Sequence, residues 1–63
     1  MQTDNENWLI NIQNTGREVA EQVGKEVVDH ILQMHGATSI EELLSSEYDQ
    51  VFSELDFIAS DLR

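Results

Sequence analysis

Two histidines, thirteen carboxylates, one tyrosine and several hydroxyls are the groups in this sequence that could perform chemistry. Glu26 and His30 are four residues apart, so a helix would present a carboxylate and an imidazole on one face. This pair offers two ligands where a structural zinc site needs four, and the chain has no cysteine. His35 directly precedes Gly36 and is expected at the carbonyl end of a helix, where a cation is favoured. We therefore expect no metal site.

The sequence also lacks the patterns that position a nucleophile or a phosphate group. It contains no glycine-rich phosphate loop, no calcium-loop spacing of acids, and no nucleophile beside a recognisable base. Glu41 and Glu42 are adjacent, so their side chains would point in different directions from a helix. Their position in the first turn of a predicted helix is explained by the helix dipole, which favours acids there. So short a chain can hardly enclose a pocket of about 300 Å³ or more. We expect no catalytic residue, no cofactor and no enzymatic activity.

The charge is strongly negative, at −10 for 63 residues, and it is unevenly distributed. The segment from Glu26 through Leu62 holds nine carboxylates, Glu26 included, and no Lys or Arg. Direct binding to nucleic acid or to an anionic membrane is therefore not expected, because both depend on cationic side chains. A protein partner with a basic surface is the electrostatic complement. The alternative is an acidic shell that only confers solubility.

Two patterns bear on localisation. No apolar run approaches the roughly 20 residues that span a bilayer. The first residues also lack the basic region and apolar core of a secretory signal. A cytoplasmic protein is therefore expected.

The elements that must position these groups are all predicted to be helices. Apolar residues recur every three or four positions, and proline is absent, which predicts an all-α fold. Gly36 is expected to end one helix, and Ser39 with Glu42 forms a capping-box pattern that opens another. We expect a small helical bundle in a single acidic domain, residues 1–63. Its elements are a long helix at about 5–35 with a possible break at 14–16, a short helix at about 40–44, and a final amphipathic helix at about 47–62.

The long first helix is apolar on two sides. Small residues repeat every fourth position along one line, which suggests close approach of another backbone; the alternative is that Gly16 is a break and Gly24 incidental. Other apolar residues fall away from the main stripe, and a helix that is apolar on two sides is usually covered on two sides. The downstream helices are too short to do this, so we expect completion by dimerisation. The packing or dimer residues are Gly16, Ala20, Gly24, Ile10, Val28 and Leu32.

One aromatic residue of the final helix points away from the predicted core. Seven apolar residues share one face of that helix, whereas Phe57 falls among acids on the other side. A single exposed apolar residue is common and needs no explanation. The other interpretation is a partner-binding surface in which an aromatic anchor supplies binding energy and acids steer association. Its residues would be Gln50, Glu54, Phe57 and Asp61.

Two functions of different kinds follow from these patterns. The favoured hypothesis is a small, non-enzymatic, acidic protein-binding module that engages a basic partner surface. A DNA-mimicking inhibitor or regulator of a nucleic-acid-binding protein is one form of it. The alternative is a homo-oligomeric scaffold protein whose acidic surface only gives solubility.

Overall fold

The computed structural model describes residues 4–62, and helices dominate this part of the chain. The elements are α1 (Asp4–Val23), α2 (Lys25–Met34), the 3₁₀ turns η1 (Ile40–Glu42) and η2 (Ser45–Glu47), and α3 (Tyr48–Leu62). No strand occurs within residues 4–62. The predicted all-α class is confirmed, and the final helix lies where it was predicted. None of the helices described has the length and apolar character that crossing a membrane requires.

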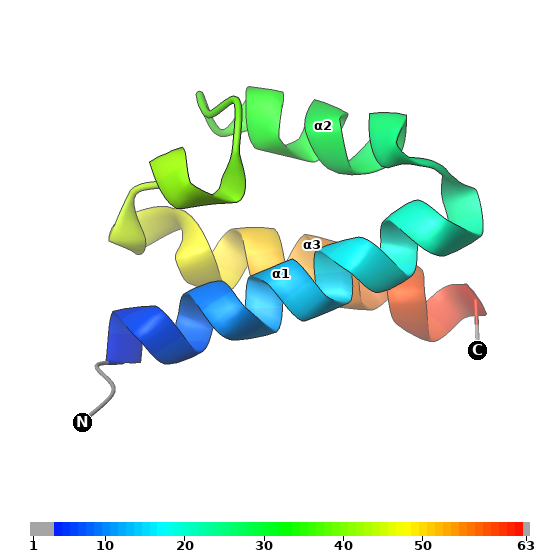
Figure 1. Cartoon of the computed structure of the whole chain (residues 1–63), viewed down its shortest axis with the longest axis horizontal. Coiled ribbons are helices and arrows are strands. Elements are labelled where there is room, and N and C mark those ends of the chain that lie inside the picture. The colour runs from blue at the N-terminus through cyan, green and yellow to red at the C-terminus, as the bar shows by residue number, and fades with distance from the viewer. Residues whose placement is uncertain (1–3, 63) are drawn as a thin grey trace.

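Helices α1 and α3 pack side by side and run in the same direction, and α2 returns across them in the opposite direction (Figure 1). Near their first turns, the rings of Trp8 and Phe52 meet edge to face, with centroids 5.8 Å apart. The largest fully buried side chains come from the same two helices: Ile12, Val19, Val51 and Leu55. The core is therefore built mainly between α1 and α3, and α2 closes it.

The expected single helix over 5–35 is in fact two helices, and the break lies at Gly24 rather than at 14–16. Gly24 has φ 107°, a conformation that only glycine adopts readily. A Cβ atom built there would lie 2.6 Å from Oε2 of Glu26. Gly24 is therefore the turn between α1 and α2, and not one member of a continuous line of small residues.

The break at Gly24 accounts for the second apolar line. Val28 and Leu32 are buried, because α2 folds back and turns their side toward the rest of the chain. By contrast, Val23 and Met34 are exposed, and Ile10 is 41 % exposed. The two-sided helix was the reason to expect a dimer. Dimerisation remains a prediction. Val28 and Leu32 no longer support it, because they are buried within the single chain.

Gly16 lies inside α1, at the point where the other elements converge on this helix. The residue is buried, and a Cβ atom there would lie 3.8 Å from side-chain atoms of Ile40, Leu55 and Val28. These three belong to η1, α3 and α2. The close approach predicted for this line of small residues is thus made within one chain at Gly16, and Ala20 packs against the same core.

Gly36 terminates helix α2, as predicted, and lies two residues beyond the last helical residue, Met34. Gly36 has φ 76°, and its N–H donates to the carbonyl of Gln33 at 3.0 Å. The N–H of Ala37 donates to the carbonyl of Leu32, also at 3.0 Å. These two hydrogen bonds form a Schellman motif, and the buried Ala37 and Leu32 supply the apolar residues that commonly accompany it.

The segment after Gly36 differs from the expected short helix at 40–44. Ser39 makes no side-chain cap, and a single 3₁₀ turn, η1, follows it. The Glu42 carboxylate instead accepts hydrogen bonds from the Thr38 hydroxyl and from the Thr38 backbone N–H, the latter at 3.0 Å. These two bonds lower the pKa of Glu42. Glu42, the acid of the predicted capping box, therefore does bond to an earlier residue, but that residue is Thr38 and not Ser39.

Candidate functional site

Phe57 has the largest exposed fraction, 75 %, among the large hydrophobic side chains that are exposed in residues 5–61. Leu55, two residues earlier, is fully buried. Two residues correspond to about 200° around a helix, so the two side chains leave α3 on opposite sides. The outward position of Phe57 follows directly from the core position of Leu55, as the sequence predicts.

Phe57 borders an open, mostly apolar groove between α2 and α3. The groove has a volume of about 420 Å³. A chain of this size was not expected to form a pocket so large, and it does so because the hollow lies on the surface between two helices. Its lining comprises Ile31 from α2 and Gln50, Ser53, Glu54, Phe57 and Ile58 from α3.

The groove brings together three of the four residues predicted to bind a partner. Gln50, Glu54 and Phe57 all line it. Asp61 is exposed one helical turn beyond Phe57 and lies outside the lining. The sequence did not indicate the second wall, Ile31, because nothing local shows which residue of α2 comes to lie beside α3.

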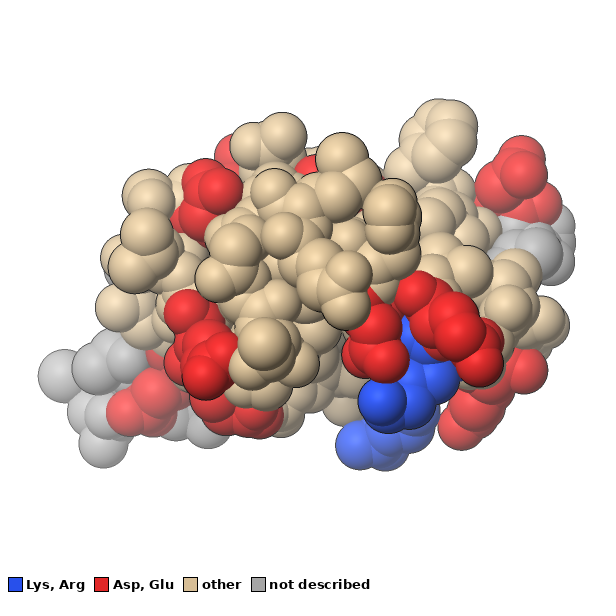
Figure 2. Space-filling model, turned by 90° about the horizontal axis from the view of Figure 1, so that it is seen from above, with Lys and Arg blue, Asp and Glu red and all other residues tan. Residues whose placement is uncertain are grey.

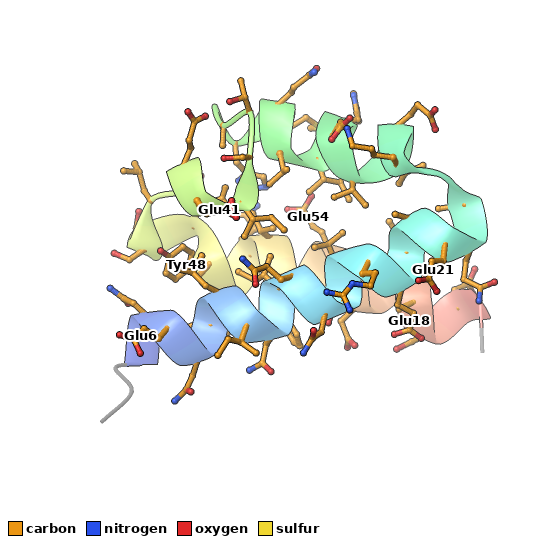
Figure 3. The ribbon with its side chains drawn as sticks, in the orientation of Figure 1. Glu6, Glu18, Glu21, Glu41, Tyr48 and Glu54 are labelled. Carbon is orange, nitrogen blue, oxygen red and sulfur yellow. The ribbon has the colours of Figure 1, made fainter. Side chains whose placement is uncertain are left out.

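Glu54 is also held by a histidine from the end of α2. Nε2 of His35 lies 2.8 Å from the Glu54 carboxylate, and Nδ1 lies 3.0 Å from the Glu47 carboxylate. The His35 side chain is only 8 % exposed. Glu54 projects from α3 toward α2 (Figure 3). These three side chains, named here the His35 cluster, therefore tie α2, η2 and α3 together.

The geometry of the His35 cluster favours the protonated, positively charged ring. A carboxylate only accepts hydrogen bonds, and a neutral imidazole has a single N–H to donate. Both contacts are hydrogen bonds only when the ring carries both protons. The hydrogen bonds to Glu47 and then Glu54 raise the pKa of His35 above its ordinary value, and burial opposes them.

Two sequence interpretations change at this cluster. His35 was expected to interact with the carbonyl end of its own helix, but its side chain contacts Glu47 and Glu54. Glu54 was expected to be a free steering acid, and it is a half-buried partner of a histidine. The contacts join residues 12 and 19 positions apart, so no helical spacing could have revealed them.

The other histidine does not form a comparable group. His30 and Glu26, which share a helix face, are both exposed on α2. Within residues 4–62, no three side chains of ligand type are placed to hold a metal ion.

Acidic side chains are spread over the molecule. Glu6 lies at one end of α1, and Glu18 and Glu21 lie toward its other end (Figure 3). In the view from above, uncharged surface fills the centre, and the blue cationic side chains lie together at one edge (Figure 2). Arg17 is the one Arg and Lys25 the one Lys among residues 4–62. Because the acids are so widely spread, the apolar groove, and not the charge, locates the candidate site.

The charged side chains at and near the groove nevertheless determine which charge it attracts. Its one charged lining residue is an acid, Glu54, and no cation lines it. Lys25 pairs instead with Asp29 at 3.0 Å on the exposed side of α2. The arrangement offers an apolar cleft with acidic surroundings.

No protein-family model, curated protein or solved structure matches this chain. The geometry of the groove and of the His35 cluster is therefore the basis for assigning a function.

Proposed function

We propose that this chain is a small, non-enzymatic protein-binding module that engages a basic partner surface through the groove between α2 and α3. The observation that carries the proposal is Phe57, a ring 75 % exposed beside an apolar groove. Aromatic side chains bury about 150–250 Å² when they are covered. Burying the exposed part of this ring would contribute on the order of 3 kcal/mol at about 25 cal/mol per Å².

The net charge supports a basic partner. A protein with charge −10 attracts cationic surfaces before contact, and this raises the association rate more than the final affinity. An inhibitor or regulator that occupies the DNA-binding surface of another protein is one form of this function. The acids that such a function would use are spread over α1, α2 and α3 and the turns η1 and η2.

The test is a comparative capture experiment with three forms of the chain. Wild type, Phe57→Ala and Leu44→Ala are immobilised at equal density and exposed to an extract of the source organism. Leu44 is the matched control because it is 69 % exposed and does not line the groove. We expect a basic protein to be retained by wild type and Leu44→Ala and largely lost from Phe57→Ala.

Equal retention by all three forms would contradict the role of the groove. A stable dimer in light scattering, together with no retained protein, would favour the scaffold alternative. Duplex DNA added in increasing amounts tests the mimic form, since DNA should displace the captured protein only if both use the same basic surface.

A further inference from the structure

The groove runs along one face of α3 for about two helical turns. The α3 residues that form it occupy positions 50, 53, 54, 57 and 58, which is one helical face over two turns. Eight residue steps at 1.5 Å correspond to about 12 Å. A helix laid along this face would present apolar side chains at i, i+3 or i+4, and i+7 over about the same distance.

The polar groups of the groove argue against an extended peptide. A buried peptide segment needs a partner for each backbone N–H and C=O. The lining offers the Gln50 amide, the Ser53 hydroxyl and the Glu54 carboxylate, and Glu54 is already engaged by His35. Residues 4–62 also contain no strand edge to which a peptide strand could add. A helix satisfies its own backbone and needs only apolar contact from the groove.

Charge decides between a foreign helix and a second copy of the chain. The His35 cluster holds two carboxylates against one imidazolium and so keeps a net negative charge beside the groove, and Asp61 lies one turn beyond Phe57. Lys or Arg beside an apolar stripe would therefore be attracted. A second copy would bring a further charge of −10, and the only Lys and Arg side chains on its described helices are Lys25 and Arg17. Repulsion between two such chains disfavours self-occupation of the groove.

We infer that the occupant of the groove is an amphipathic α-helix of a partner protein, with apolar residues at i, i+3 or i+4 and i+7 and with Lys or Arg along both borders of that stripe. This inference rests on the proposed function and specifies the structure of the partner segment. The apolar stripe of the partner helix would contact Phe57 and Ile58 on the α3 side of the groove and Ile31 on the α2 side.

Three synthetic peptides of equal length test this inference by calorimetric titration of the full chain. The first has Leu at the stripe positions and Lys elsewhere. The second has the same composition, with Leu spread evenly around the helix. The third keeps the Leu stripe and replaces Lys with Glu. We expect the first peptide to bind at least about tenfold more tightly than the second, and the third not to bind.

Variants of the chain locate the binding. Phe57→Ala and Ser53→Lys, two changes at exposed lining positions, should each weaken binding of the first peptide about tenfold or more. Leu44→Ala should bind it as wild type does. Circular dichroism of each variant checks that the helices are intact. The ellipticity of the complex should also exceed the sum of its parts, since the peptide folds on binding.

The outcomes separate this inference from the proposed function. Equal binding of the first and second peptides would overturn the helix inference and leave a module that attracts basic proteins. Binding of neither basic peptide would overturn both. A wild-type dimer that Phe57→Ala converts to monomers would show that a second copy occupies the groove, which also overturns the inference.

Discussion

At the scale of the residue, Leu55 and Phe57 show how one helix places one side chain in the core and another on the surface. Leu55→Ala should lower the free energy of unfolding by about 2–5 kcal/mol, because it removes a fully buried side chain and leaves a cavity. Phe57→Ala should change it by less than about 0.5 kcal/mol, since the ring is mostly exposed. Urea denaturation measures both. A large loss for Phe57→Ala would show that the ring is structural.

Gly16 and Gly24 should respond in opposite directions to the same substitution. Gly16→Ala should raise the free energy of unfolding by up to about 1 kcal/mol, because Ala is the better helix former and its Cβ meets neighbours at 3.8 Å. Gly24→Ala should lower it by about 1 kcal/mol or more, because φ is 107° there. Thermal denaturation of the two variants tests this. Destabilisation by both would mean that the crossing at Gly16 has no room for a methyl group.

At the scale of the element, the His35 cluster fastens the end of α2 to η2 and α3. The pKa of His35 is raised in the folded protein, so the folded state holds this proton more tightly than the unfolded state. The stabilisation is complete below the ordinary pKa of about 6.5 and is lost as the pH rises through the higher folded value. The free energy of unfolding, measured by urea titration at a series of pH values, should therefore fall over this window.

Two histidine variants provide the controls for this pH dependence. His35→Gln should abolish the fall, because the titrating group is gone while a hydrogen-bonding side chain remains. His30→Gln changes an exposed histidine of the same helix and should preserve it. If the fall persists in His35→Gln, some other group causes it.

At the scale of the whole molecule, salt should act in opposite directions on folding and on binding. The chain carries −10, so screening by salt relieves repulsion between its carboxylates and should raise the melting temperature. The same screening should weaken association with a basic partner. Melting curves, and titrations with the Leu and Lys peptide at low and physiological salt, measure the two effects. Binding that does not respond to salt would remove the electrostatic part of the proposed function.

The sequence by itself determined the features that depend on residues close together in the chain. The core face of α3 and the outward position of Phe57 follow from the spacing of apolar residues on one helix. The end of α2 at Gly36 follows from the need for a left-handed residue after the last turn. Both depend on backbone geometry within a few residues, and both were correctly predicted.

The tertiary structure alone decided where the first helix breaks, which side chains hold His35, and that a groove exists. Gly24 disfavours a helix by only about 1 kcal/mol relative to Ala, so its propensity did not show whether the helix would continue. The break allows Val28 and Leu32 to be buried, and burying each such side chain is worth about 1.5–3 kcal/mol. The fold-back brings α2 beside α3, so that His35 reaches Glu54 and Ile31 lines the same groove as Phe57. Such contacts join residues far apart in the chain, and therefore the spacing of neighbouring residues does not predict them.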